Sequence, residues 1–566
     1  MREYDEIIAI LGEWGPFQAL IYILLSLSAI PSGYTALSMV FLADIPPHHC
    51  RLPFLNSSYG GLGYNLSIPT EEVKGKIILS RCRRYIEQGD SDAVFGNDTE
   101  GCLDGWVFSK ERYVSTIVTE WNLVCDDAWK APFTVTVFFL GVLAGSFCSG
   151  IISDRYGRKL TFFSSKALLT VFSLVLIASN SWEMFCVVYC FVGMMDVANY
   201  CTAFILGAEL LSKSARMSFG ILGVCSCFAI GYAILPLFAY FIRSWRTLQL
   251  ALSLLGFLYI PLWWYVPESP RWLITQGRFQ EAEAIIRAAA IKNGITPPDD
   301  FFQLEHSAEE KVIPENPTIE HESGGQNKYT WLDLLKTKNI RNITVLNIII
   351  WISINIAYYG LSFNTSNLDG DPYLNCLIAA STEFVAYIFV WFTTRYAPRR
   401  FTLPFTLLLG GVLLLLIELV PQELNALTVA LAMTGKLVVT GAFSFVYFYS
   451  TELFPTVVRN MGLGVTSMAA RIGSTLSPYI AYIGTYNSVL PYILMGAISI
   501  ISGVLSLLLP ETKGEELPEL ISQVKPLQWL CRKKKSVDKN NQDGSLRSEV
   551  ELTLHQRGLQ TTINTF

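Results

Sequence analysis

The segment 145–159 reads GSFCSGIISDRYGRK, and it constrains the fold more than any other part of the chain. An apolar run with small residues ends abruptly at Ser153, a charged turn follows, and a second apolar run starts at Leu160. Two membrane helices joined by a tight basic turn explain this pattern best. Because short loops rich in Arg and Lys face the cytoplasm, this turn also predicts the sidedness of the rest of the chain.

The composition agrees with a membrane protein. Hydrophobic residues make up 51% of the chain and charged residues 16%, whereas soluble domains have about 25% charged residues. The charges are clustered and leave about a dozen apolar runs of roughly 20 residues, which is the length that spans a bilayer core. The net charge of −5 is not that of a nucleic-acid binder, which would present a basic face.

The fold class predicted from these runs is an all-α membrane protein with twelve transmembrane helices in two six-helix bundles. A short helix is expected at 279–290, a flexible linker at 297–328 and a disordered tail at 529–566. The predicted divisions of the chain are a cytoplasmic N-terminus at 1–16, a first span at 17–42, a large extracellular loop at 43–130, five spans within 131–266, a cytoplasmic loop at 267–340, six spans within 341–509 and a cytoplasmic tail at 510–566.

The segment 43–130 carries two further signs of an extracellular location. An even number of cysteines in such a segment predicts two disulfides, and their spacing leaves all three pairings open. The segment also contains three sequons for N-glycosylation. The cysteines are Cys50, Cys82, Cys102 and Cys125, and the sequons are at Asn56, Asn65 and Asn97.

The two halves of the chain repeat each other. Glu209 and Arg216 recur as Glu452 and Arg459 at an offset of 243 residues, and the Pro-Glu pair at 267–268 recurs at the same offset. A degenerate copy of the basic turn, APRR at 397–400, stands at an offset of 241. A parallel repeat of this kind predicts a substrate site between the halves, near the membrane midplane.

These motifs resemble those of the major facilitator superfamily, for which turns of the GxxxDRxGRK type are diagnostic. More narrowly, the chain is similar to the organic ion transporter family and its carnitine/organic cation branch. The similarity covers nearly the whole chain except much of the outer loop, the linker and the tail. The matching stretches include YDE at 4–6, LGEWG at 11–15, STIVTEW at 115–121, PESPRWL at 267–273 and ELFPTVVRN at 452–460.

The resemblance implies a multi-pass plasma-membrane carrier that moves carnitine-like zwitterions and organic cations by alternating access. It implies no cofactor, although some members of the branch couple transport to sodium; Ser32 stands here where that branch has asparagine. The alternative is a facilitative carrier of plain organic cations or anions without sodium coupling. An enzyme is not expected, because no nucleophile, metal group or acid pair gathers at one membrane face.

Four ionisable residues inside the predicted spans are candidate substrate ligands: Asp196, Glu383, Lys436 and Arg471. A charge in the membrane is costly unless it is paired or functional. We expect Arg471 to bind a substrate carboxylate, because the guanidinium fork fits that group, and the resemblance agrees, since the carnitine branch has arginine where cation-selective members have an acid. For Glu383 and Lys436, pairing with each other is an equally good interpretation.

The cationic end of such a substrate requires aromatic faces, because a quaternary ammonium has no N–H to donate. Phe443 and Tyr447 are four residues apart and are expected to share one helix face. The alternative for each aromatic residue is a position facing lipid or the membrane interface. The candidates are Tyr358, Phe443, Tyr447 and Tyr449.

Charged residues at the cytoplasmic helix ends are predicted to form ion pairs between the bundles. Such pairs would hold the cytoplasmic side shut when the cavity faces out, and because they break in every cycle they bias two states. The predicted gating residues are Asp154, Arg155, Arg158, Glu209, Arg216, Glu452 and Arg459.

Two weaker motifs complete the sequence. The C-terminal tripeptide NTF at 564–566 resembles a ligand of a PDZ scaffold protein, but Asn564 stands where Ser or Thr is preferred. All five histidines lie outside the predicted spans, which excludes a histidine-based metal site in the membrane. We therefore expect no metal.

Overall fold

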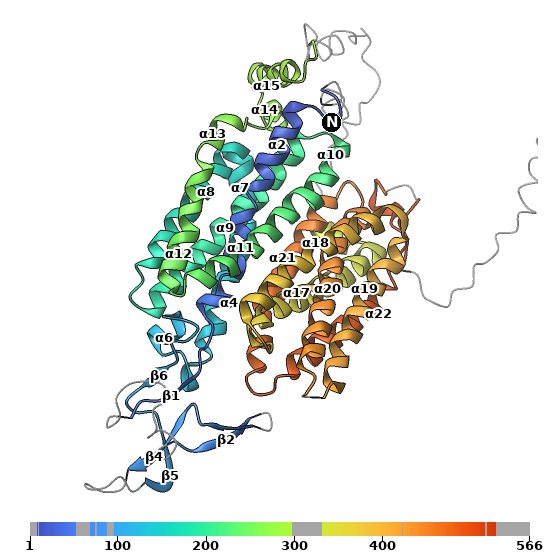
Figure 1. The fold of residues 1–566 in the computed structure, drawn as a ribbon. Coiled ribbons are helices and arrows are strands. Elements are labelled where there is room, and N and C mark those ends of the chain that lie inside the picture. Colours follow the sequence, from blue (N-terminus) through green and yellow to red (C-terminus); the bar gives the residue numbers. More distant parts are fainter. Residues whose placement is uncertain are drawn as a thin grey trace, which may run out of the picture.

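The computed structural model describes residues 8, 11–52, 68–73, 76–87, 95–296, 331–421, 423–514 and 518–527. Its helices stand side by side in two bundles, one from the first half of the chain and one from the second (Figure 1). Ten helical stretches in these residues are long and apolar enough to cross a membrane. The linker at 297–328, the tail at 529–566 and its NTF motif lie outside the described residues.

The first bundle contains the spans predicted within 17–42 and 131–266. Its first span is broken after Leu27, and the helix resumes with Pro31 in its first turn, where the missing N–H of proline costs no hydrogen bond. The fifth span starts with a π-helix and the sixth is interrupted near Pro261. The elements are α2 (Pro16–Leu27), α3 (Ile30–Leu37), α4 (Met39–Leu42), α7 (Lys130–Tyr156), α8 (Arg158–Ile177), α9 (Trp182–Leu210), α10 (Lys213–Ser218), η2 (Phe219–Cys225), α11 (Ser226–Phe241), α12 (Trp245–Leu254), η3 (Leu255–Tyr259) and α13 (Leu262–Tyr265).

The second bundle provides the remaining six spans. Two of them fall outside the ten apolar stretches: α21 is long enough but carries several polar residues, among them Arg471, and α22 is apolar but has only 17 residues. With these two, all twelve predicted spans are present as helices. The elements are α17 (Lys338–Phe363), η5 (Asn364–Asn367), α18 (Pro372–Tyr396), α19 (Arg399–Leu416), η6 (Ile417–Leu419), α20 (Asn425–Leu453), α21 (Arg459–Ile483) and α22 (Leu490–Ser506).

Glycines allow the helices of the first bundle to pack closely. A Cβ on Gly141 of α7 would lie 2.0 Å from the carbonyl oxygen of Cys190 on α9, and a Cβ on Gly33 of α3 would lie 2.1 Å from that of Phe228 on α11. Small residues at such crossings let helix backbones approach each other, as is common in membrane bundles. Gly145 of the opening motif packs in the same way, since a Cβ there would lie 2.3 Å from the carbonyl oxygen of Met194 on α9.

The pair of bundles carries different elements at its two ends, which we call the strand end and the turn end. At the turn end lie the basic turn, α14 (Pro270–Thr275), the predicted helix at 279–290, present as α15 (Phe279–Lys292), and η4 (Trp331–Leu335). At the strand end the segment between α4 and α7 forms three two-stranded antiparallel sheets (Figure 1). The all-α prediction holds for the bundles and is incomplete for this segment, whose elements are β1 (His48–Cys50), β2 (Thr70–Val73), β3 (Lys76–Leu79), β4 (Arg83–Glu87), β5 (Phe95–Gly101), β6 (Trp106–Phe108), α6 (Ile117–Trp121) and η1 (Cys125–Asp127).

The cysteines of the strand end lie in two pairs. The structure joins Cys50 to Cys102 and Cys82 to Cys125, with Cα–Cα distances of 5.0 and 5.7 Å. These distances lie within the usual range for disulfides. His48 lies next to the second pair, and its ring nitrogen and the two sulfurs fall within 4.8 Å of one another. Because those sulfurs are bonded to each other, they cannot act as thiolate ligands for a metal.

Ring contacts join the bundles at the strand end. Tyr373, at the start of α18, stacks on Phe41 of α4 at 5.3 Å and meets Tyr240 of α11 at 5.6 Å. Tyr113, from the segment that precedes α6, contacts the same ring at 6.3 Å. Tyr373 is thus a shared contact that closes this end between the two bundles.

The first testable prediction concerns the cysteine pairing. Protein purified from the secretory pathway, alkylated without reduction and digested, should yield linked peptides for Cys50–Cys102 and Cys82–Cys125, because the fold brings these pairs to bonding distance. Mass spectrometry gives the measurement. The sequons at Asn56 and Asn65 lie outside the described residues, and Asn97 lies in β5; the same digest should show glycans at all three. Alkylation of all four cysteines without reduction would contradict the topology.

The second prediction concerns His48. Burial lowers the pKa of His48 to about 4, whereas a histidine in an unfolded chain titrates near 6.5. The unfolded strand end therefore binds a proton more readily than the folded one. The folded strand end thus loses stability as the pH falls from about 6.5 to about 4. Hydrogen exchange in β1 and β6, corrected for intrinsic rates, should be faster at pH 5 than at pH 7, and His48→Gln should remove most of the difference. An unchanged pH dependence in the variant would contradict this assignment.

Candidate functional site

Arg471 lies on α21 at the interface between the bundles. The helix α21 packs against α7 of the first bundle, and the Thr136 hydroxyl on α7 donates a hydrogen bond of 3.1 Å to the carbonyl of Thr475. The Arg471 guanidinium lies within electrostatic reach of Tyr359 and Tyr447 of its own bundle and of Cys201 on α9. Its Nε has no hydrogen-bond partner among the described residues. The interface therefore holds a cation with unused hydrogen-bonding capacity.

Asp196 lies on α9 and approaches this cation from the first bundle. Its side chain is buried, with 6% exposed, and its Oδ1 has no hydrogen-bond partner among the described residues. The charges that act on it come from Lys166 on α8 and from Arg471 across the interface. Asp196 thus stands between one cation of its own bundle and one of the other bundle.

Glu383 and Lys436 lie together in the second bundle, which agrees with the interpretation that they pair with each other. The Lys436 ammonium is 3.7 Å from Glu383 Oε1 and donates to the Ser362 hydroxyl at 2.8 Å. Glu383 also accepts hydrogen bonds from the hydroxyls of Tyr358 at 2.7 Å and Tyr387 at 3.0 Å. Both charges are fully buried with their partners, so neither offers a vacant bond to a substrate in this state.

Lys436 also connects the two bundles. Its ammonium donates a hydrogen bond of 3.2 Å to the hydroxyl of Tyr232 on α11 and lies 4.5 Å from the centre of that ring. The pair with Glu383 is therefore part of the bundle interface. Its partners Tyr232 and Tyr387 were not predicted, because aromatic residues are frequent in all spans and nothing in their spacing singles these out.

Three predicted aromatic residues form a continuous surface beside Glu383. The Tyr358 ring stacks on Phe443 at 4.7 Å, Phe443 meets Tyr447 at 5.6 Å, and Tyr447 meets Trp351 at 4.2 Å. Tyr447 is 37% exposed. The expectation that Phe443 and Tyr447 share a face is confirmed. Trp351 was missed, although it precedes Tyr358 by two helical turns and therefore lies on the same face of α17.

Tyr449 is a correction to the predicted substrate site. It is buried, and its hydroxyl donates to the carbonyl of Pro510 at the turn end. It contacts Phe445 on the opposite face of α20 from Phe443 and Tyr447. Two residues advance a helix by about 200°, so Tyr449 cannot share the face of Tyr447. Its role is to anchor the end of α20.

In this structure the predicted gating residues form ion pairs within each bundle. The expected pairs between the bundles concern the state whose cavity faces out, and they stay a prediction. Arg158 pairs with Glu209 at 3.2 Å and with Asp154 at 2.9 Å, all in the first bundle. Glu452 pairs with Arg399 at 3.4 Å in the second bundle. The basic turns face the ends of α9 and α20 directly, so each arginine reaches the acid of its own bundle first.

The remaining gating residues have local contacts. Arg216 and Arg459 donate to the carbonyls of Leu211 and Phe454, just beyond the ends of α9 and α20, at 3.1 and 3.3 Å. These two contacts obey the same repeat of 243 residues. Arg155 lies over the ring of Tyr156 at 5.5 Å.

Two glutamates that were noted only as repeat markers complete these clusters. Glu268 Oε1 accepts hydrogen bonds of 3.0 Å from the backbone N–H groups of Arg158 and Lys159 at the start of α8. Glu511 accepts bonds from the corresponding N–H groups of Arg399 and Arg400 at the start of α19, at 2.9 and 3.1 Å. Each carboxylate thus satisfies unpaired donors at the positive end of a helix dipole.

The tight approach of Glu268 explains the glycine in the basic turn. Gly157 has a φ of 103°, and a Cβ there would lie 2.5 Å from Glu268 Oε2. Only glycine adopts this backbone conformation without strain and leaves room for the carboxylate. The DRYGRK motif is therefore a turn whose acid, glycine and arginine are all used within one bundle.

Comparisons with known proteins agree with this architecture. A family described as "Sugar (and other) transporter" matches residues 109–523. The organic cation/carnitine transporter 2 of Homo sapiens is 48% identical over 549 residues, which are 94% of this chain and 96% of that protein. Solute carrier family 22 member 4 of Mus musculus is 48% identical over 559 residues, which are 96% and 98% of the two chains.

A solved structure shares the fold. The inward open conformation of the xylose transporter XylE from E. coli has a TM-score of 0.57 and 14% identity, covering 90% of this chain and 100% of that chain. The chain belongs to the sugar (and other) transporter family, which has the major facilitator fold. Within it, the chain falls in the carnitine/organic cation branch that the motifs predicted, and it is a membrane transporter, not an enzyme.

The third prediction tests the pairing within the second bundle. Glu452→Arg places two cations side by side at the turn end and should reduce uptake of a labelled substrate at least about tenfold. The reason is that a buried charge which loses its partner costs about 3–5 kcal/mol of free energy. Combining it with Arg399→Glu restores the pair in reverse and should recover much of the uptake. Surface expression of each variant is measured in parallel.

Arg158→Glu is the matched control, since it changes the equivalent arginine of the other bundle. It should not rescue Glu452→Arg if pairing stays within bundles. Rescue by Arg158→Glu and not by Arg399→Glu would show that Glu452 pairs across the bundles, and it would contradict pairing within the second bundle.

Proposed function

We propose that this chain carries carnitine-like zwitterions and organic cations across the plasma membrane by alternating access, with both termini in the cytoplasm. The observation that carries the proposal is the juxtaposition of an incompletely bonded arginine, Arg471, with an aromatic surface on α17 and α20. A zwitterion with a carboxylate and a trimethylammonium group needs both features at once. The names of the relatives, which include carnitine transporters, support the same substrate class.

The aromatic surface is proposed as the cation subsite. Tyr358, Phe443, Tyr447 and Trp351 contact one another in one continuous arrangement, in which Tyr358 and Trp351 are buried and Tyr447 is the accessible ring. Rings attract a quaternary ammonium through their quadrupoles, by an amount that grows when water is excluded. Glu383 accepts a hydrogen bond from the Tyr358 hydroxyl and so holds that ring in place, while the Lys436 ammonium offsets its charge.

Arg471 is proposed as the carboxylate subsite. Its guanidinium lies within electrostatic reach of Tyr447, so the two subsites adjoin. A charge-assisted hydrogen bond between guanidinium and carboxylate contributes about 1.5–3 kcal/mol. Glu383 and Lys436, which were candidate ligands, are proposed instead to support Tyr358 and the bundle interface.

The alternative is a facilitative carrier of plain organic cations or organic anions without sodium coupling. One observation favours the absence of sodium: Asp196, the acid nearest Ser32, already lies in the field of the Lys166 ammonium. A fixed cation beside that acid opposes the binding of a second cation at the same place. Sodium as the coupling ion is therefore the less favoured of the two possibilities.

The fourth prediction compares two substrates in one variant. Arg471→Ala should lower the uptake of carnitine into proteoliposomes by about ten- to a hundredfold, because the carboxylate loses its charge-assisted bond. Uptake of tetraethylammonium, which has no carboxylate, should change far less. Phe443→Leu removes a ring face and should weaken the uptake of both substrates, since each carries a quaternary ammonium.

The comparison has a clear negative outcome. Equal losses of carnitine and tetraethylammonium uptake in Arg471→Ala, at normal amounts of reconstituted protein, would mean that Arg471 only supports the structure. Uptake of neither substrate by the unaltered protein would contradict the proposed substrate class itself.

A further inference from the structure

The first bundle contains a buried cation that the proposed substrate site does not use. Lys166 on α8 is only 4% exposed, and its Nζ has no hydrogen-bond partner among the described residues. The ammonium lies 4.3 Å from the centre of the Tyr259 ring. A buried ammonium gains too little from one ring to offset its lost hydration, so it requires a counter-charge.

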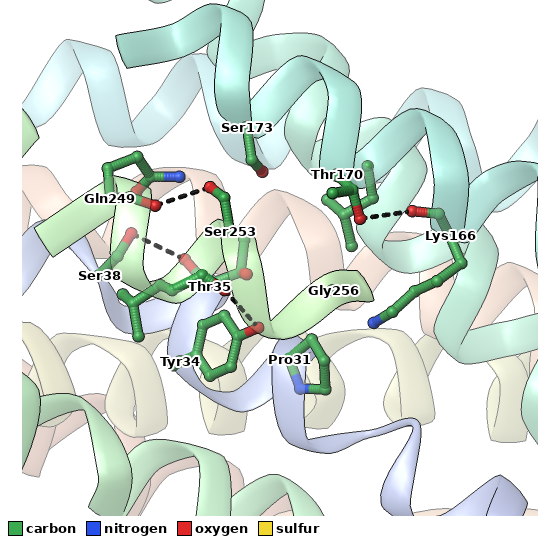
Figure 2. Close-up of a pocket in the computed structure, with 12 residues that line it drawn as sticks. Pro31, Tyr34, Thr35, Ser38, Lys166, Thr170, Ser173, Gln249, Ser253 and Gly256 are labelled. Atoms are coloured by element: carbon green, nitrogen blue, oxygen red, sulfur yellow. Dashed lines mark hydrogen bonds between the residues drawn. The ribbon is translucent and has the colours of Figure 1, made fainter. Parts of the chain in front are cut away.

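A small polar cavity adjoins this lysine. The cavity has a volume of about 20 Å³, enough for about one water molecule. Figure 2 shows Lys166 extending toward Pro31, with hydroxyl and amide groups around the rest of the space. The lining includes Tyr34, Ser173, Gln249 and Ser253. This arrangement offers water a place beside the ammonium inside the bundle.

Asp196 supplies the counter-charge, but it is shared. The carboxylate lies in the fields of Lys166 and Arg471, one on each side of the bundle interface. Ser32, which follows Pro31, is buried, and its hydroxyl lies close enough to the carboxylate to favour the charged form of Asp196. The three side chains of Asp196, Lys166 and Arg471 each keep an atom without a partner, although each is charged and lies inside the membrane part.

We propose that Asp196 is a proton-binding site that couples proton entry to the binding of a zwitterion at Arg471. The inference rests on the proposed function of Arg471. Without substrate, the fields of Arg471 and Lys166 favour the charged form of Asp196 against the effect of its burial. When a substrate carboxylate neutralises Arg471, Asp196 loses part of that support and takes up a proton from the aqueous side to which the carrier is open. After the bundles rock, the carboxylate and the proton leave on the other side.

The coupling is reciprocal. A proton on Asp196 removes the anion that competes with the substrate for Arg471, so protonation must strengthen zwitterion binding by the same factor by which the zwitterion strengthens protonation. A plain cation leaves Arg471 unneutralised and should not draw in a proton. The titratable and charged groups that face Asp196 are Lys166 on α8, Tyr34 on α3, Tyr189 and Cys201 on α9, Tyr359 on α17 and Arg471 on α21.

Lys166 has a distinct part in this device. Its positive charge favours the ionised form of Asp196 between transport events, and it makes a second cation such as sodium unfavourable at this place. Lys166 is therefore a positioning residue for the charge of Asp196, with no contact to substrate.

The direct test measures protons and substrate together. The purified full chain is reconstituted into proteoliposomes that contain a pH-sensitive dye, without a sodium gradient. Addition of carnitine should acidify the interior, and addition of tetraethylammonium should not. The KM for carnitine should fall by about fivefold or more when the external pH is lowered from 7.5 to 5.5, a factor at the low end of usual coupling.

Two variants locate the proton. Asp196→Asn keeps the shape and stays neutral, so its KM for carnitine should be low at both pH values and carnitine should no longer acidify the interior. Lys166→Met keeps the length without the charge, so the fall in KM should occur at higher pH than in the unaltered protein. Acidification by Asp196→Asn equal to that of the unaltered chain would overturn the proposal.

The failure of this inference differs from failure of the proposed function. If Arg471→Ala loses carnitine selectively but carnitine never acidifies the vesicles, the carboxylate subsite stands and the proton site is wrong. Should a variant not reconstitute, the dye signal and the pH dependence of the unaltered protein still decide the question.

Discussion

A charge inside a membrane protein must meet a partner, and this requirement organises the structure. Glu383 satisfies it with the ammonium of Lys436 and two tyrosine hydroxyls, all within the buried interface. The acids of the turn end satisfy it with arginines and with the free N–H groups of helix starts. Among the described residues the requirement is incompletely met at Arg471, Asp196 and Lys166: both cations act on Asp196, and each of the three keeps an atom without a hydrogen bond there. Buried charges without complete partners in the membrane are functional by default, and these three lie where the bundles meet.

The turn-end clusters make each bundle a unit, as the proposed rocking of the bundles requires. Glu268 ties the start of α8 to the segment that follows the sixth span, while Arg158 ties it to the end of α9. Glu511 and Arg399 repeat this arrangement in the second bundle, where the Thr512 hydroxyl also donates to Glu452. Cross-links within a bundle make it rigid without opposing motion between bundles, which suits a hinge or shear transition of packed units. The same residues would oppose the motion if they bridged the interface.

The sequence predicted the fold well and the site in part. Apolar runs and the repeat of 243 residues were sufficient for twelve spans and two bundles, and the spacing of Phe443 and Tyr447 correctly placed them on one face. The strands between α4 and α7 were missed because their stabilisation comes from disulfides and short pairings, which leave little periodicity. The pairing of Glu452 with Arg399 was within reach, since the degenerate turn carries that arginine at nearly the repeat offset. Lys166 was missed, although it lies in the middle of α8 and a lysine inside a span is as costly as the four charges that were singled out.

The central claim is that Arg471 recognises the carboxylate of the substrate, and a thermodynamic cycle tests it most directly. Equilibrium binding to the purified protein is measured for carnitine and for its methyl ester, which lacks the carboxylate charge but keeps the ammonium. Both ligands are measured with the unaltered chain and with Arg471→Ala. If the two groups interact, removing both costs no more free energy than removing either one, because the second change has nothing left to break. The account predicts this non-additive result, with a coupling of about 1.5–3 kcal/mol. Losses that simply add would show that the carboxylate and Arg471 act independently and would contradict the account.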